Sequence, residues 1–267
     1  MNEPLLLIHG FTDTGSTWTT VRPYLEPHHE LIVPTLAGHC GGPETPAGMT
    51  DPLAAMADDL ERVLDEAGHD RVHVVGNSLG GFLAFELGAR GRASSVTTLS
   101  PALGWETPHA PAHTQRQFKM AHRMGPWAAK HARSLVSRPG LRKIAFRDVV
   151  AHPERMKPAL AHDLITGSAQ CSIFDALIEH LDSGDYRPQW PSDLGVPTRI
   201  AWGTKDRTIP SKTCSGWYRK ALPDAEWVDL PDCGHLPQHD DPELVARTIL
   251  EVTARAQALP RTAAARS

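Results

Sequence analysis

The sequence predicts an α/β fold, in which a doubly wound, mostly parallel sheet is interrupted by an inserted block of helices. Short β-branched or apolar segments alternate with helical segments up to about residue 100 and again after residue 192. In between the strand pattern stops, over a stretch too long for an ordinary connection. We therefore expect a core formed by residues 1–101 and 192–257, a helical insertion over 102–191, and a disordered tail over 258–267.

The first part of the core reads as strands and helices in turn. Asp51 and Pro52 suit the N-cap and the first position of a helix, and Gly68 ends that helix. The other segments expected here are strands over 5–8, 30–33, 71–75 and 95–99 and helices over 18–25 and 81–90.

The remaining elements follow the same reasoning. The insertion is expected to hold helices over about 114–124, 127–137, 141–149, 158–165 and 172–181. The core then resumes with strands over 199–202 and 226–230 and ends with a helix over about 242–256.

The most informative motif is Gly-Asn-Ser-Leu-Gly at residues 76–80, which lies between an expected strand and an expected helix. A Gly-x-Ser-x-Gly in that context describes a nucleophile elbow. Glycines stand where side chains would clash in the tight turn, and the Ser78 oxygen is held clear of the backbone at the start of a helix. An ordinary glycine-rich turn with a capping serine is the alternative.

An acid and a histidine follow the serine in the order that a Ser-acid-His triad of this kind requires. Asp206 comes just after the expected strand over 199–202, and His235 just after the strand over 226–230. Loops after strands of a parallel sheet gather at its carboxyl edge. We therefore expect Ser78, Asp206 and His235 to meet there as nucleophile, acid and base.

The first strand supplies the last part of this site. It runs into His9-Gly10-Phe11, and a second oxyanion donor in such sites comes from an amide in this loop. We expect the N–H groups of Phe11 and Leu79 to form the oxyanion hole. His9, directly after a strand, suits a hydrogen bond that orders the loop better than a role as base.

Taken together, these segments resemble the α/β-hydrolase superfamily. The matching stretches are Leu5 to Phe11, Pro34 to His39, Gly76 to Gly81, Trp202 to Asp206 and Gly234-His235, and the resemblance covers roughly residues 4–100 and 192–257. It implies the α/β-hydrolase fold and the same three roles for Ser78, Asp206 and His235. It also implies that the inserted helices form a cap that shields the nucleophile and shapes the pocket.

Two features depart from the family pattern. Many members carry an antiparallel hairpin before the first strand of this chain, and the loop after the second strand often reads Gly-His-Gly, where Cys40 here follows His39. Cys40 and Cys233 have no role that the sequence assigns. Aromatic residues of the insertion are candidates for the substrate pocket, with packing inside the cap as the alternative: Trp105, Phe118, Trp127, Phe146 and Phe174.

Composition limits the classes of partner. The chain has 267 residues, is 40% hydrophobic and carries a net charge of −4, which favours a globular enzyme over a polyanion-binding protein. It has no signal-like or membrane-spanning apolar run, and its four cysteines have no metal or redox spacing. His109 and His113 have the i, i+4 spacing that could hold a metal ion on one face of a helix. Pro111 lies between them and no carboxylate motif accompanies them, so we expect no metal site there. We expect a cytoplasmic protein with no metal, no cofactor, no nucleic acid and no membrane as partner; the sequence does not specify its oligomeric state.

The expected reaction is cleavage of a small carboxylic ester. His235 takes the proton of Ser78 during attack, Asp206 orients the imidazole, and water cleaves the acyl-enzyme. Serine argues against the superfamily's dehalogenases and epoxide hydrolases, which attack with an aspartate. The alternatives are a carbon–carbon bond hydrolase or enol-lactonase, an acyl transferase or cyclase, and a non-catalytic binding protein.

Overall fold

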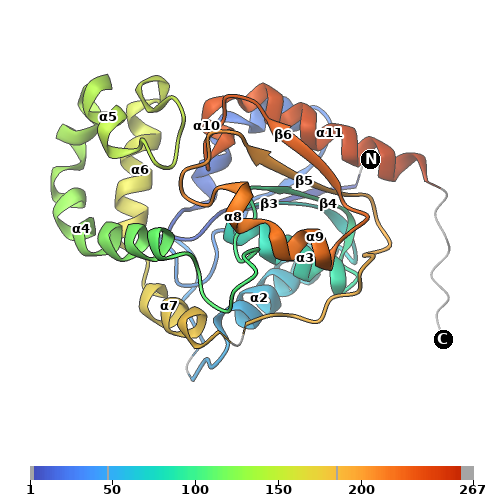
Figure 1. Cartoon of the computed structure of the whole chain (residues 1–267). Helices are drawn as coiled ribbons and strands as arrows, with labels where there is room; N and C mark the ends of the chain where they lie inside the picture. The colour runs from blue at the N-terminus through green and yellow to red at the C-terminus, as the bar shows by residue number, and fades with distance from the viewer. Residues whose placement is uncertain (1–2, 47, 185, 260–267) are drawn as a thin grey trace.

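The computed structural model describes residues 3–46, 48–184 and 186–259. Its six-stranded sheet has the order β2-β1-β3-β4-β5-β6, of which Figure 1 labels β3 to β6, and every pair of neighbouring strands is parallel. The strands are β1 (Leu5–Ile8), β2 (Leu31–Ile32), β3 (Val72–Asn77), β4 (Ala93–Leu99), β5 (Thr198–Gly203) and β6 (Glu226–Leu230). The strand order reverses direction between β1 and β3, so the two loops at this switch point open a crevice at the carboxyl edge.

Helices cover both faces of the sheet, which confirms the doubly wound α/β fold. One face packs against α2 (Pro52–Glu66), α3 (Leu79–Ala89) and the short helices α8 (Ser211–Cys214) and α9 (Gly216–Ala221). The other face packs against η1 (Gly15–Thr20), α1 (Arg22–Leu25) and α11 (Pro242–Ala258).

The apolar run of β1 follows from this layering. Leu6 and Ile8 belong to the core cluster on one face, and Leu5 and Leu7 belong to the cluster on the other. Because both faces are buried, every residue of the strand is apolar rather than every second one. The β1 backbone is therefore buried between the two helical layers and fixes the loop that follows it.

Four helices and a 3-10 turn lie between β4 and β5. They are α4 (Ala112–Ser137), α5 (Pro139–Ala145), η2 (Pro153–Arg155), α6 (Pro158–Ala169) and α7 (Phe174–Ser183). Helices α4 to α6 stand beside the sheet on one side (Figure 1). They have a small core of their own, to which Leu236 of the loop after β6 also belongs.

The prediction of two helices over 114–124 and 127–137 was wrong, because α4 continues through Pro126. A proline inside a helix removes one hydrogen bond and usually kinks or ends it. Here α4 packs along α6, and Gly125 allows close approach to Ala169. Packing against α6 therefore outweighs the local preference for a break.

Other differences concern element ends. The expected helix over 18–25 is divided into η1 and α1, and α8, α9 and α10 (Pro237–Asp240) are too short to have been recognised. The expected tail overlaps α11 at Ala258, and from Pro260 onward it lies outside the described residues. Over the described ranges, no helix combines the length and apolarity needed to cross a bilayer.

Besides His235, five histidines are buried in the folded chain: His9, His29, His39, His73 and His239. Burial opposes the charged imidazolium and lowers the pKa of His9 to about 3 and those of His39, His73 and His239 to about 4. These side chains are therefore neutral in the folded protein at neutral pH.

We expect the free energy of unfolding to fall as the pH falls below about 6.5. Between about pH 6.5 and 4 the unfolded chain binds protons at His9, His39, His73 and His239 and the folded chain does not. Each of these four therefore contributes up to about 1.4 kcal/mol of lost stability per pH unit. Urea unfolding at pH 7.5, 6.5 and 5.5 measures this slope. His73→Gln should reduce the slope, and the exposed His113→Gln should not; a stability that is constant over this range would contradict the account.

Candidate active site

Ser78 occupies a strained turn between β3 and α3. Its backbone has φ 55° and ψ −116°, an unfavourable conformation for a residue with a side chain. The flanking glycines are required by space: a Cβ on Gly76 would lie 1.9 Å from the Gly80 carbonyl oxygen, and one on Gly80 would lie 2.3 Å from the Ile8 oxygen. The motif thus forms a strand–turn–helix of the elbow type.

His235 and Asp206 are joined by a buried hydrogen bond. The His235 Nδ1–H donates to Asp206 Oδ2 at 2.9 Å, and the Asp206 side chain is fully buried. The other carboxylate oxygen accepts the N–H groups of Thr208 and Ile209, both at 2.9 Å. These bonds fix the carboxylate in the loop after β5, and they leave His235 Nε2 as the nitrogen available for proton transfer.

The other carboxylates near His235 in sequence serve different partners. Asp232 lies at the surface, where it pairs with His152 at 2.6 Å and with Lys205. Asp241 caps α11 through the Leu244 N–H. Asp240 accepts the N–H groups of Gly234, Ala151 and His152 at 2.8–3.0 Å. Among the described residues, Asp206 is the one carboxylate that hydrogen-bonds the His235 ring.

Ser78 and His235 lie on neighbouring loops without a direct hydrogen bond between their side chains in the described part of the chain. Catalytic hydrogen bonds are often long without substrate and tighten in the complex. Asn77, next to Ser78, donates to the His235 carbonyl at 3.0 Å and to the Leu99 carbonyl at 2.9 Å. This fully buried amide links the serine turn to the histidine loop.

Two backbone N–H groups are free beside Ser78. Within the described residues, neither Phe11 N–H nor Leu79 N–H donates a hydrogen bond to another backbone or side-chain group. Leu79 is the first residue of α3, whose early N–H groups have no partner inside the helix. Gly10 brings the two loops together, because a Cβ on it would lie only 3.1 Å from Ser78 Cβ.

His9 is held by hydrogen bonds on both ring nitrogens. Nδ1 bonds the Gly10 carbonyl at 2.8 Å, and Nε2 accepts the Leu36 N–H at 2.9 Å. The first bond requires a proton on Nδ1 and the second a lone pair on Nε2, so the ring is neutral. His9 therefore ties the loop after β1 to the loop after β2.

A small, mostly apolar cavity of about 60 Å³ adjoins Ser78. Phe11 and Leu79 line it beside the serine, and Trp105, Phe118 and Ile209 line it farther out. Its wall combines the carboxyl edge of the sheet with α4 and α7 of the insertion. An apolar group attached to a carbonyl fits this lining.

Three of the five predicted pocket residues lie elsewhere. Trp127 is 51% exposed and stacks on His131, and Phe146 is buried in the separate core of the insertion. Phe174 stacks on Phe11 with ring centroids 5.1 Å apart, so it supports the wall without lining the cavity.

The two cysteines without an assigned role also lie in defined places. Cys40 bonds Gln170 at 3.5 Å, and burial raises the pKa of the Cys233 thiol to about 12.

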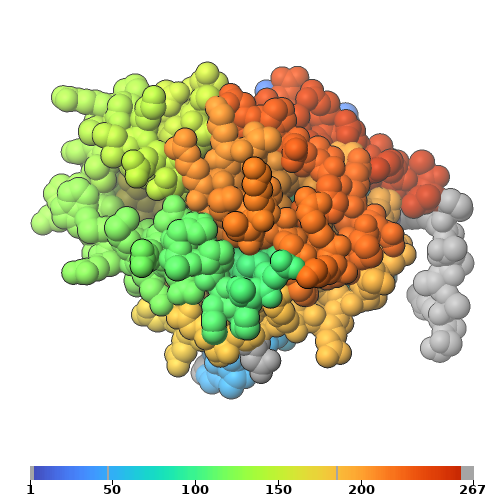
Figure 2. Space-filling view, viewed as in Figure 1, coloured from blue at the N-terminus to red at the C-terminus, as the bar shows by residue number. Residues whose placement is uncertain are grey.

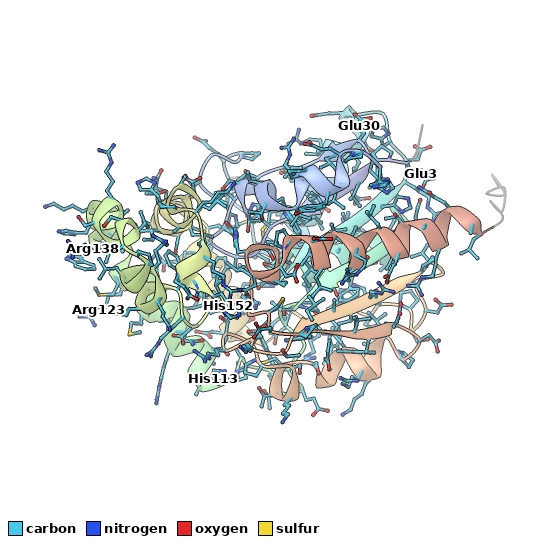
Figure 3. All side chains as sticks on the ribbon, turned by 90° about the horizontal axis from the view of Figure 1, so that it is seen from above. Glu3, Glu30, His113, Arg123, Arg138 and His152 are labelled. Carbon is cyan, nitrogen blue, oxygen red and sulfur yellow. The ribbon has the colours of Figure 1, made fainter. Side chains whose placement is uncertain are left out.

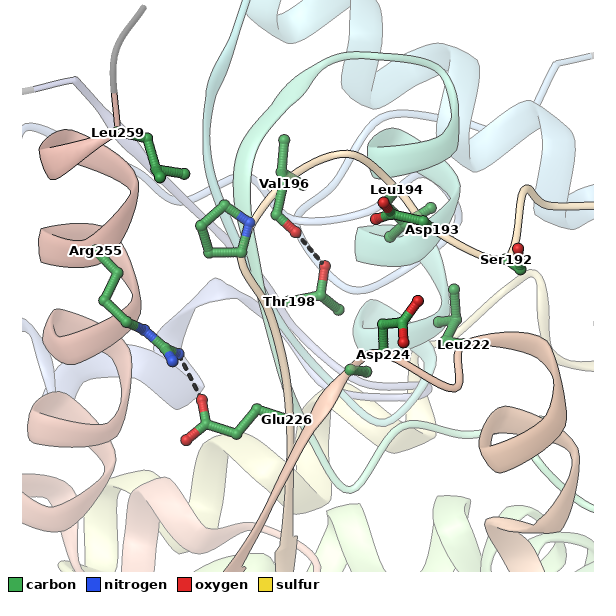
Figure 4. Close-up of a pocket in the computed structure, with 12 residues that line it drawn as sticks. Ser192, Asp193, Leu194, Val196, Thr198, Leu222, Asp224, Glu226, Arg255 and Leu259 are labelled. Atoms are coloured by element: carbon green, nitrogen blue, oxygen red, sulfur yellow. Dashed lines mark hydrogen bonds and ion pairs between the residues drawn. The ribbon is translucent and has the colours of Figure 1, made fainter.

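A larger cavity, of about 300 Å³, opens at the opposite edge of the sheet (Figure 4). Its walls are the segments that enter β5 and β6 and the end of α11, and Arg255 pairs there with Glu226. None of the candidate catalytic residues borders it. Cavity volume therefore does not single out the candidate active site, which is chosen for the chemistry of the residues around Ser78.

Asp13 is a buried carboxylate near the site that the sequence did not single out. It lies in the loop after β1, accepts the Thr14 N–H at 2.8 Å, and has a second oxygen with no partner among the described residues. Burial raises its pKa to about 6, and a nearby His235 acts in the opposite direction. In the sequence, the feature that could have pointed to Asp13 as a site residue was its position four residues after His9.

Comparisons with known proteins identify the family of the chain. The profile of the family described as alpha/beta hydrolase fold matches residues 3–242. The chain belongs to the α/β-hydrolase family. It is 32% identical over 200 residues to the epoxide hydrolase EphH of Mycobacterium tuberculosis, an alignment that covers 73% of this chain and 92% of that protein.

Other similar proteins carry different names. Lipase 1 of Psychrobacter immobilis is 27% identical over 252 residues, covering 88% of this chain and 72% of the lipase. A thermophilic esterase from Thermogutta terrifontis superposes with a TM-score of 0.70 at 24% identity, over 96% of this chain and 91% of the esterase. The chain thus belongs to a family of hydrolases.

Proposed function

We propose that the protein is a serine hydrolase that cleaves a small carboxylic ester through an acyl-enzyme. The observation that carries the proposal is the convergence at one sheet edge of Ser78 in its strained turn, the buried His235–Asp206 pair and two free N–H groups. Ser78 and Leu79 follow β3, Asp206 and His235 follow β5 and β6, and Phe11 follows β1. A binding protein would have no need of all of them together.

In the proposed mechanism, His235 Nε2 takes the Ser78 proton as the serine oxygen attacks the ester carbonyl. Asp206 holds the tautomer with the proton on Nδ1 and stabilises the imidazolium that forms. His235 then protonates the departing alcohol. In the second half, it takes a proton from water, which cleaves the acyl-enzyme.

The N–H groups of Phe11 and Leu79 are proposed to bind the oxyanion. Both line the cavity beside Ser78, and each donor of this kind contributes roughly 3 kcal/mol of transition-state stabilisation. His9 supports this role indirectly, because its hydrogen bonds to Gly10 and Leu36 hold the loop that carries Phe11.

The name of the relative EphH raises epoxide hydrolysis as a second reaction, which the elbow residue disfavours. Attack of a serine oxygen on an epoxide carbon would form an ether, which water does not cleave under mild conditions. Attack of a carboxylate would form an ester, which water can cleave. Ser78 at the elbow therefore favours substrates with a carbonyl carbon.

Residues 102–191, which include helices α4 to α7, are proposed to form a cap over the cavity. They close the cavity on the side away from the sheet, and Phe118 of α4 and Trp105 supply aromatic walls.

We further propose a cytoplasmic protein, in keeping with its free thiols at Cys40, Cys171, Cys214 and Cys233.

We expect kcat/KM to rise with acyl chain length until the cavity is full and then to fall. A buried methylene contributes about 0.8 kcal/mol, which is up to about fourfold per carbon. Phe118→Ala should move the optimum to longer chains, because its ring lines the cavity. Trp127→Ala is the matched control and should leave the optimum unchanged, because that ring is half exposed on the same helix. A p-nitrophenyl ester series measures both.

A panel of substrates tests the choice of reaction. The proposal predicts that p-nitrophenyl esters are hydrolysed faster than thioesters, enol-lactones and vinylogous diketones of similar size. Rapid cleavage of a diketone, with a flat profile across acyl lengths, would instead favour the carbon–carbon hydrolase. Faster transfer of the acyl group to an added alcohol or amine than to water would favour an acyl transferase.

A further inference from the structure

The outer side of the insertion is strongly basic. Residues 107–147 contain nine arginines and lysines and no aspartate or glutamate, in a chain whose net charge is −4. One of the nine, Arg142, is buried and donates to the Val136 and Glu154 carbonyls. The other eight are exposed on or beside α4 and α5: Arg116, Lys119, Arg123, Lys130, Arg133, Arg138, Lys143 and Arg147.

Most of these cations have no carboxylate partner among the residues that the structure describes. Lys119 pairs with Asp182 at 3.1 Å, and Arg147 lies 3.6 Å from Asp148. Over the ranges that the structure describes, none of the other six has a carboxylate within 4.0 Å. Arg123 and Arg138 lie at the end of the molecule farthest from α11 (Figure 3). The charge is therefore available to an outside partner.

The same surface exposes large apolar side chains. Met120 is 66% exposed, Trp127 51% and Ile144 72%, and Met124 and Leu141 are also exposed. Of the seven large apolar side chains that are exposed in the described chain, these five lie on α4 and α5. Their helices form the protruding green side of the molecule (Figure 2). An exposed apolar group of this size usually marks an interaction surface.

The spacing along α4 separates this surface from the cavity except at Lys119, which borders the cavity and pairs there with Asp182. Met120, Met124 and Trp127 follow one another at i, i+4 and i+7 and share one face of the helix. Phe118 faces the cavity, and Gly125 packs against α6. Helix α4 thus has an inner side that covers the candidate active site and an outer side that is basic and apolar.

We propose that the outer face of α4 and α5 docks this protein on an anionic phospholipid surface. A helix with cations beside Trp, Met and Ile side chains lies in the plane of a lipid interface, with its apolar face among the acyl chains and its cations at the phosphates. Nucleic acid would use the cations but leave the aliphatic side chains in water. The absence of a membrane partner expected above rested on a missing spanning segment, and surface docking needs none.

Vesicle sedimentation tests the proposal with the whole protein. Binding is expected to vesicles of phosphatidylcholine and phosphatidylglycerol at about 7:3, to be much weaker to phosphatidylcholine alone, and to fall with added salt. Arg123→Glu/Lys130→Glu should weaken binding by at least about 25-fold, since each cation near an anionic surface contributes about 1 kcal/mol. Met120→Ser/Ile144→Ser should also weaken it, with the salt dependence retained.

Matched controls make the result decisive. Lys212→Glu/Arg247→Glu changes the net charge equally at exposed sites on α8 and α11, and should bind vesicles as the wild type does. Ser78→Ala should also bind normally, because docking does not require catalysis, and thermal unfolding checks that each variant is folded. Equal binding to neutral and anionic vesicles, no vesicle binding, equal loss in the control pair, or tighter binding of a DNA duplex through Arg123 and Lys130 would each overturn the proposal.

Discussion

Replacing Ser78 by alanine is expected to abolish ester turnover, with kcat reduced by a factor on the order of 10⁶. The oxygen that forms the acyl-enzyme is lost, while the backbone that holds it keeps its partners: Ser78 N–H donates to Leu99, and its carbonyl accepts from Gly81 and Ala102. The variant should therefore remain folded. Hydrolysis of a p-nitrophenyl ester, with thermal unfolding measured in parallel, checks both statements.

Ser100→Ala provides a matched control. Ser100 is a buried serine at the end of the next strand, and it also has a positive φ, of 45°. Its hydroxyl accepts the Gly203 N–H and does not border the cavity. A loss of less than about tenfold is expected there. Turnover by Ser78→Ala at the wild-type rate would show that the nucleophile lies elsewhere.

Asp206→Asn is expected to reduce kcat by about 10⁴-fold. The amide oxygen of asparagine can still accept the N–H groups of Thr208 and Ile209, so the turn should survive. The amide nitrogen, however, would face His235 Nδ1 as a donor and stabilise the wrong tautomer. The loss should therefore appear in catalysis and only weakly in stability.

Two other carboxylates test the choice of acid. Asp232→Asn should have little effect on kcat, because that side chain pairs at the surface with His152 and Lys205. Asp13→Asn removes a buried carboxylate near His235. Burial raises the pKa of this Asp13 carboxylate to about 6. If Asp13→Asn were the crippling change and Asp206→Asn mild, the acid would come from the loop after β1.

Local sequence was informative wherever one strand and its following loop determine the result. The apolar run of β1, the capped start of α2 at Asp51 and the turn at Gly76–Gly80 all follow from side chains within a few residues. Asp206 and His235 lie 29 residues apart in the chain. Because parallel strands align their carboxyl ends, their approach could be anticipated from the two strands that they follow. Their catalytic roles, and that of Ser78, stay predictions.

Features that depend on packing between distant segments could not be read in this way. Helix α4 passes through Pro126 because it packs along α6, and Trp127 lies outside the cavity because that packing sets which side of α4 faces inward. The link from Asn77 to the His235 carbonyl joins residues 158 positions apart in the chain. Nothing in the composition of any single segment encodes these contacts.

Reaction with a fluorophosphonate probe tests the central claim most directly, because it needs no knowledge of the natural substrate. The probe reacts with a serine oxygen only where a base takes its proton and an oxyanion hole receives the phosphoryl oxygen. The account predicts a single adduct per chain, located on Ser78 by peptide mapping, and strongly slowed labelling in His235→Ala. Absence of labelling in the folded protein, or an adduct on another serine, would contradict it.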